Sequence, residues 1–124
     1  MRTKRRIVVI DDDEWLVDTY THTLAKAGYE VARAANALEA VQVIDTFQPD
    51  VIILDIFMPG PNGVALLHEL QSYPDLARIP VIVVTNAARD IRHGALTPYG
   101  VQAVLDKTAM TPEDILLAVK RVML

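Results

Sequence analysis

The chain has 124 residues, no cysteine and a formal net charge of −4. This length suits one folded domain, here residues 1–124, and leaves no room for a second. The missing cysteines exclude disulfides and thiolate metal sites, and the acidic balance argues against nucleic acid as a direct partner. No apolar stretch approaches the roughly 18 residues of a membrane span, and the run at 7–10 is too short for a secretion signal. We therefore expect a cytoplasmic protein without a membrane partner.

In the first half of the chain, apolar runs alternate with helical patterns. Residues 7–10 are continuously apolar, which is typical of a strand buried on both faces. The segment 14–27 carries apolar side chains at helical spacing and stops at Gly28, a residue type that ends helices. A second strand is expected at 29–34, and a helix with an asparagine as its cap follows over 36–47.

The second half of the chain continues this alternation. A third strand is expected at 51–54, followed by a run of turn-forming residues at 59–63 and a helix over 63–72. A fourth strand is expected at 79–84. Residues 87–99 contain an internal glycine and a Thr-Pro pair, so any helix in that segment is short.

The chain closes with a fifth strand at 103–105 and a last helix. Thr111 is expected as the cap of this helix, Pro112 as its first residue and Asp114 as the acid of a capping box. Five strands that alternate strictly with five helices predict right-handed crossovers and helices on both faces of one sheet. The predicted fold is therefore α/β: a doubly wound, flavodoxin-like three-layer sandwich with a parallel five-stranded sheet of order 2-1-3-4-5.

Carboxylates follow two strands that should be neighbours in this sheet. Asp11, Asp12 and Asp13 follow the first strand, and Asp55 follows the third. Ligands of such sheets bind at the carboxyl ends of the strands where the strand order reverses, which is between these two strands. Carboxylates so close together repel one another. Mg²⁺ would relieve this repulsion, because it accepts a few carboxylates and also binds phosphate oxygens.

The other two strand ends at this edge add a hydroxyl and an ammonium. Thr85 follows the fourth strand, and Lys107 follows the fifth. A phosphoryl group in transfer needs a metal on some of its oxygens and a cation and hydroxyl on the others. Asp55 would be the carboxylate nucleophile, forming an acyl phosphate.

Several nearby residues have simpler structural explanations. Asp13 is interpreted as the cap of the first helix. Trp15 and Phe57 are interpreted as packing residues rather than as a stacking platform. The three histidines share no spacing and are interpreted as ordinary surface or helix residues: His22, His68 and His93.

Four segments together resemble the receiver domains of two-component response regulators. They are the strand and acids at 7–13, the run 49–63 around Asp55, the strand 81–85 and the residues 105–107. The resemblance extends over essentially the whole chain, and the segment around Asp55 is its most specific part.

This resemblance implies a phosphoacceptor function. Asp55 would accept a phosphoryl group from a sensor histidine kinase or a histidine phosphotransfer protein, and Thr85 and Lys107 would bind its oxygens. The implied Mg²⁺ ligands are Asp12, Asp55, the Phe57 backbone carbonyl and, through water, Asp11. The protein would not be an enzyme beyond Mg²⁺-assisted self-phosphorylation and autodephosphorylation. Phosphorylation would switch binding to a downstream protein target, and the last strand–helix face could serve for a homodimer.

The sequence departs from the family pattern outside this group. The family usually has an aromatic switch residue where Val104 stands, a tiny residue where Asn86 stands and a proline, after a cis bond, where Thr108 stands. A cis bond before a residue other than proline costs about 2.5–4 kcal/mol. We therefore expect a trans bond between Lys107 and Thr108.

The positions two residues after the predicted acceptor and hydroxyl are Phe57 and Ala87. Neither side chain can orient a hydrolytic water, so we expect a long-lived acyl phosphate.

The atypical residues Val104, Asn86 and Thr108 keep a second function open, namely a pseudo-receiver that binds partners without phosphorylation. An aspartyl-phosphate hydrolase with Asp11 as nucleophile and Asp13 as acid–base is disfavoured, because the expected turn residues and a cap domain are missing.

Overall fold

The computed structural model describes residues 3–58, 63–92 and 94–123. Its centre is a sheet of five parallel strands in the order β2-β1-β3-β4-β5, which confirms the predicted topology. The strands are β1 (Arg6–Ile10), β2 (Glu30–Ala34), β3 (Val51–Leu54), β4 (Val81–Thr85) and β5 (Val101–Asp106). Most of the predicted turn at 59–63, and His93, lie outside the described residues.

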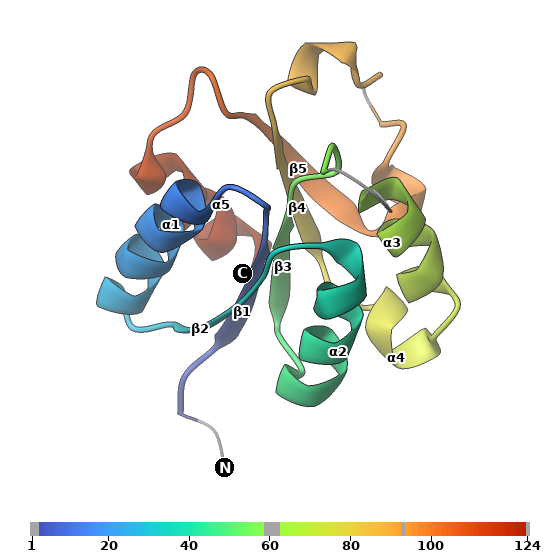
Figure 1. Ribbon diagram of the computed structural model, residues 1–124, viewed down its shortest axis with the longest axis horizontal. Helices are drawn as coiled ribbons and strands as arrows, with labels where there is room; N and C mark the ends of the chain where they lie inside the picture. Colours follow the sequence, from blue (N-terminus) through green and yellow to red (C-terminus); the bar gives the residue numbers. More distant parts are fainter. Residues whose placement is uncertain (1–2, 59–62, 93, 124) are drawn as a thin grey trace.

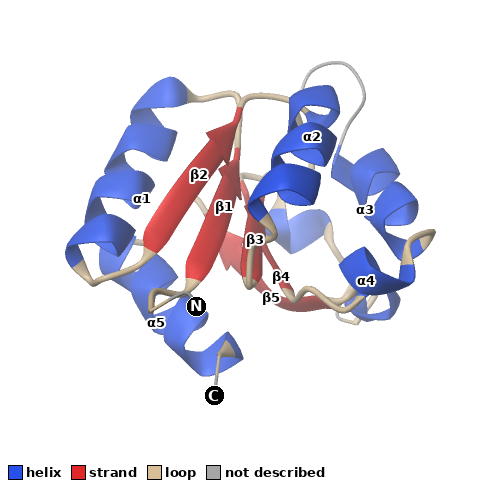
Figure 2. Cartoon of the chain, turned by 90° about the horizontal axis from the view of Figure 1, so that it is seen from below, coloured by secondary structure: helices blue, strands red, loops and turns tan. Residues whose placement is uncertain are grey.

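Helices cover both faces of the sheet. They are α1 (Glu14–Lys26), α2 (Ala37–Phe47), α3 (Gly63–Gln71), α4 (Pro74–Ala77) and α5 (Pro112–Val122). Figures 1 and 2 show α1 and α5 on one face and α2 and α3 on the other. Two layers of buried side chains, one on each face, join these helices to the strands. Within the described ranges, no helix has both the length and the apolarity to cross a membrane.

The central strand β1 is buried on both faces. Ile7 and Val9 belong to the core layer under α1 and α5, whereas Val8 and Ile10 belong to the layer under α2 and α3. All four side chains are fully buried. Burial of side chains of this size contributes about 1.5–3 kcal/mol each. The strand is therefore a firm support for the acids that follow it.

The described residues between β4 and β5, 86–92 and 94–100, form no α-helix. It forms two short 3₁₀ turns, η1 (Ala88–Asp90) and η2 (Thr97–Tyr99). Gly94, between these turns, has a φ of +79°, which interrupts a right-handed helix. Pro98 lacks the N–H that a helix interior needs. The prediction that any helix here is short is confirmed, whereas the strict alternation of strands with α-helices is wrong at this place. The short helix α4, before β4, is an element that the sequence pattern does not predict.

The ends of the main helices follow the predicted signals. The Asp13 carboxylate accepts two backbone N–H groups from the first turn of α1, at 3.1 and 3.2 Å, which confirms it as the cap. Asn36 caps α2 in the same way. At the start of α5, the N–H of Thr111 donates to the Asp114 carboxylate at 2.8 Å, as expected for a capping box.

Candidate functional site

Two buried carboxylates lie where β1 and β3 end. The N–H of Asp55 donates to the Ile10 carbonyl at 3.0 Å, and the N–H of Asp11 donates to the Ala34 carbonyl at 3.1 Å. The sheet ladder thus continues one residue past the strands and fixes both acids at the carboxyl edge. The side chains of Asp11 and Asp55 are among the few buried polar groups of the described chain.

Each of these acids uses one oxygen to shape its own loop. Asp11 Oδ1 accepts the N–H of Asp13 at 3.0 Å, and Asp55 Oδ1 accepts the N–H of Phe57 at 3.0 Å. In both cases the bond spans two residues, which is the geometry of a local Asx turn. The second oxygen, Oδ2, remains for partners from other elements.

Lys107, from the loop after β5, joins the two acids. Its Nζ lies 2.6 Å from Asp11 Oδ2 and 3.0 Å from Asp55 Oδ2, and the exposed fractions of the three side chains are at most 9%. The Lys107 backbone N–H donates to the Thr85 carbonyl at 3.0 Å. Residues from three separate strand ends therefore meet in one buried ion cluster, which is the convergence predicted for this edge of the sheet.

Burial and charge act in opposite directions on this cluster. Burial raises the pKa of Asp11 above its usual range, although hydrogen bonds from Lys107 and Asp13 act to lower it. Burial acts to lower the pKa of Lys107, but hydrogen bonds to Asp11 and Asp55 outweigh that effect and raise it. The ammonium therefore stays charged at neutral pH. An additional cation would favour the ionised form of Asp11.

Asp12 adds a third carboxylate at the same place. One oxygen from each of Asp11, Asp12 and Asp55 lies within 4.8 Å of the others, and Asp12 is exposed to solvent. Mg²⁺ holds oxygens at about 2.1 Å, so opposite ligands are about 4.2 Å apart. Oxygens spaced this closely could hold one metal ion. The donor set of hard carboxylate oxygens fits Mg²⁺.

Thr85 is buried at the end of β4. Its exposed fraction is 1%, and its Oγ1 accepts the N–H of Ala87 at 3.1 Å. Thr85 pairs with Asp106 across the sheet, one residue before Lys107. The hydroxyl is thus at the same edge as the ion cluster, and its hydrogen remains available for an acceptor.

The atypical positions lie on the β4–β5 side of the site. Val104, in β5, is 37% exposed and pairs with Val83 of β4. Asn86 is exposed. Among the described residues every peptide bond is trans, which confirms the expectation for Lys107–Thr108.

Two aromatic residues beside the site are exposed. Trp15, at the start of α1, is 72% exposed, and Phe57, after β3, is 56% exposed. Their interpretation as packing residues is therefore wrong. Trp15 lies in the first turn of α1, and Phe57 lies in the loop that follows β3. His22 and His68 are exposed, as expected, and His68 contacts Tyr99 edge to face.

Gly63 allows the chain after the acceptor to return close to β3. A Cβ at this position would lie 2.5 Å from the Ile56 Cα, a distance that real Cβ atoms do not reach. The Gly63 N–H also donates to the Ile56 carbonyl at 3.0 Å. The glycine at the start of α3 is therefore required by close approach, which sequence reasoning recognised only as a turn signal.

Sequence reasoning also missed the contacts that shape the loop around Lys107. Asp106 Oδ1 accepts both the N–H and the hydroxyl of Thr108, at 2.9 and 2.6 Å. The Asp-x-Thr spacing is a sequence signal for such a turn.

The fold and site define a doubly wound domain with an acidic crevice and a buried lysine. The family model described as response regulator receiver domain matches residues 7–120. The chain belongs to this family.

Related proteins agree with this assignment. The polar-differentiation response regulator DivK of Brucella anthropi is 28% identical over 111 residues, which cover 90% of each protein. Protein PilH of Pseudomonas aeruginosa is 36% identical over 80 residues, which cover 64% of this chain and 66% of PilH. The structure of the chemotaxis response regulator CheY4 of Vibrio cholerae matches with a TM-score of 0.85 at 28% identity, covering 97% of this chain and 99% of that one.

Proposed function

We propose that this protein accepts a phosphoryl group on Asp55 from a phosphohistidine of a sensor kinase or phosphotransfer protein. The observation that carries this proposal is the ion cluster: Lys107 lies within hydrogen-bond distance of Asp11 and Asp55 at the edge of the sheet. A structural ion pair would need one acid for one lysine. Here three carboxylates lie close together, and a single ammonium contacts two of them, which leaves negative charge for further cations to balance.

In the proposed reaction, a carboxylate oxygen of Asp55 attacks the phosphorus atom. The new O–P bond forms as the N–P bond to the donor imidazole breaks, and the imidazole nitrogen keeps the electron pair of that bond. The Lys107 ammonium lies beside Asp55 and would then donate a hydrogen bond to a phosphoryl oxygen that carries the negative charge. The Thr85 hydroxyl would donate its hydrogen to another.

The carboxylates define the proposed cofactor. Mg²⁺ held by Asp12, Asp55 and the Phe57 carbonyl, with Asp11 acting through water, would offset the negative charge between Asp55 and the incoming phosphoryl group. The chain's own contribution is to hold these acids in place through β1 and β3. We propose no enzymatic activity on other substrates; self-phosphorylation and autodephosphorylation complete the cycle. Because the proposed kinase draws on ATP, we also propose a cytoplasmic location.

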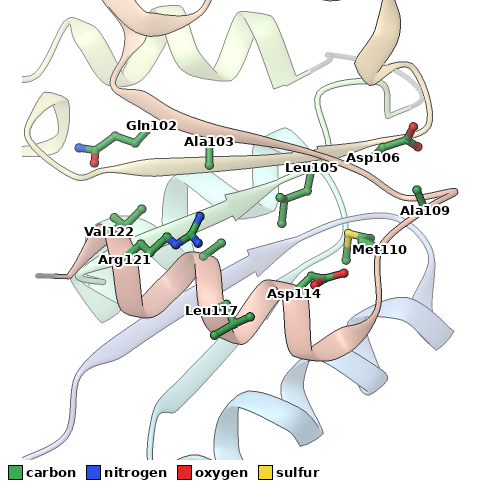
Figure 3. Close-up of a pocket in the computed structure, with 11 residues that line it drawn as sticks. Gln102, Ala103, Leu105, Asp106, Ala109, Met110, Asp114, Leu117, Arg121 and Val122 are labelled. Atoms are coloured by element: carbon green, nitrogen blue, oxygen red, sulfur yellow. The ribbon is translucent and has the colours of Figure 1, made fainter.

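The proposed output surface is the face formed by β5 and α5. A groove of about 500 Å³ runs between them, and Leu117 on its α5 side is 55% exposed. Figure 3 shows Asp106 and Asp114 at one end of this groove and Arg121 at the other. Such a face is self-complementary under a two-fold axis, because acids of one copy would meet the arginine of the other. A downstream protein target or a second copy of this chain would bind here.

A pseudo-receiver is the second candidate function. It is favoured by Lys107, which neutralises part of the acid cluster, and by the atypical Val104 and Thr108. Such a module would bind its partner through the same fold without a covalent change.

Labelling with a small phosphodonor tests the proposal. The protein is incubated with phosphoramidate and Mg²⁺, and intact mass is measured. We expect addition of one phosphoryl group, which EDTA and Asp55→Asn abolish. Equal labelling of the wild type and Asp55→Asn, or no labelling of either, would favour the pseudo-receiver.

A further inference from the structure

The loop that carries Lys107 is closed by one neighbouring residue. The Asp106 carboxylate accepts the N–H and hydroxyl of Thr108, at 2.9 and 2.6 Å. The Asp106 carbonyl accepts the N–H groups of Ala109 and Met110, at 3.1 and 3.0 Å. Asp106 therefore bonds to each of the three residues that follow Lys107, and the lysine lies inside the resulting turn.

The backbone of Lys107 is fixed from the other side as well. Its N–H donates to the Thr85 carbonyl of β4 at 3.0 Å. A lysine side chain loses much of its rotamer freedom when it is fixed. A backbone that already aims the side chain at Asp11 and Asp55 reduces the number of conformations that must be excluded. A small change in the backbone conformation of the turn would displace the ammonium by more, because the ammonium lies at the end of a long side chain.

The two residues of this turn match each other chemically. Thr108 has both a backbone N–H and a hydroxyl, so it can donate twice to the same carboxylate oxygen. These two bonds also lower the pKa of Asp106, which keeps its carboxylate ionised as an acceptor. The bond between Lys107 and Thr108 is trans, so the turn depends on these hydrogen bonds rather than on a proline ring.

We infer that Asp106 and Thr108 are positioning residues for Lys107: together they form a clasp that holds its ammonium against Asp11 and Asp55. The clasp comprises Asp106, Thr108 and the four hydrogen bonds that Asp106 accepts, two at its carboxylate and two at its carbonyl. It touches neither the acceptor carboxylate nor a phosphoryl group, and acts only through Lys107. The part of this inference that concerns phosphorylation rests on the proposed function.

Three variants separate this role from a general effect on folding. Asp106→Ala removes the acceptor, Thr108→Val removes the hydroxyl but keeps the shape, and Thr108→Ser restores the hydroxyl. Asp75→Ala, an exposed aspartate in the first turn of α4, serves as control. The readouts are the Kd for Mg²⁺ by calorimetry, the rate of labelling by phosphoramidate, and the hydrogen-bonded ammonium signal of Lys107 in ¹⁵N NMR.

The expected effects on metal binding and phosphorylation have opposite signs. A loosened ammonium competes less for Asp11 and Asp55, so Mg²⁺ should bind about threefold more tightly, whereas labelling should slow about tenfold in Asp106→Ala and less in Thr108→Val. The ammonium signal should weaken in both, and Thr108→Ser and the control should resemble the wild type.

Other outcomes have a defined meaning. Unchanged Mg²⁺ affinity and ammonium signal would overturn the clasp, and so would parallel losses of metal binding and labelling, which indicate only a damaged fold. Unchanged labelling with a shifted Mg²⁺ affinity would overturn its role in phosphorylation. If the wild type is never labelled, the proposed function fails, while the ammonium signal still decides whether the clasp positions Lys107.

Discussion

Replacing Lys107 with methionine keeps most of the side-chain length but removes the charge between Asp11 and Asp55. The wild-type ammonium lies 2.6 and 3.0 Å from the two acids, with all three side chains largely buried. Removing one partner of a buried ion pair costs about 3–5 kcal/mol. The crevice opens toward the exposed Asp12, so we expect a value near the lower end, about 3 kcal/mol at pH 7 in EDTA.

The size of this loss should depend on pH and on Mg²⁺. Burial already raises the pKa of Asp11, and removing the lysine raises it further. An acid with a raised pKa in the folded state loses stability as the pH rises from its ordinary value of 3.8 through the raised one. The loss should therefore shrink between pH 7 and pH 5. Without the competing ammonium the variant should bind Mg²⁺ more tightly than the wild type, so the loss should also be smaller when both proteins are unfolded at the same saturating Mg²⁺ concentration.

Urea unfolding followed by circular dichroism measures these free energies. Lys120→Met, at an exposed position of α5, controls for the substitution itself and should change stability little. A loss below about 1 kcal/mol for Lys107→Met, or a loss that neither acid nor Mg²⁺ reduces, would refute the electrostatic account of the cluster.

Three further predictions concern the surroundings of the site. The phosphorylated protein should decay slowly, because Phe57 and Ala87 cannot orient water; a half-life of seconds, measured by loss of labelled protein in EDTA-quenched samples, would contradict this. Gly63→Ala should lower the free energy of unfolding by about 1–3 kcal/mol, since its Cβ would meet Ile56; urea unfolding measures this, and an unchanged midpoint would refute the close approach. Leu117→Asp should leave phosphoramidate labelling unchanged but weaken self-association of the labelled protein in sedimentation velocity; unchanged association would exclude the β5–α5 face.

The strands and the acids were predictable because both follow from local chemistry. Apolar runs without polar interruption leave few alternatives to buried parallel strands, and strand ends in such a sheet must share an edge. Asp11, Asp55 and Lys107 could therefore be brought together before any coordinates were known. What the sequence could not give is which oxygen faces which partner, because that depends on the turns formed after each strand.

The errors have physical causes as well. Trp15 and Phe57 are large and apolar, so residue type favoured burial, but Trp15 in the first turn of α1 and Phe57 in the loop after β3 are both exposed. Between β4 and β5 the described residues form only the two 3₁₀ turns η1 and η2. Gly94, with its positive φ, and Pro98, which lacks an N–H, together prevent a continuous α-helix there. The Asp106–Thr108 contacts depend on a turn conformation that a pattern of residue types only suggests.

The most direct test of the account is to locate the phosphoryl group in the chain. After phosphoramidate treatment with Mg²⁺, borohydride reduces an acyl phosphate to an alcohol, and peptide mass spectrometry identifies the changed aspartate. The account predicts reduction at Asp55 and at no other acid. Reduction at Asp11 or Asp12 instead, or none in a protein that binds Mg²⁺ with its cluster intact, would contradict it.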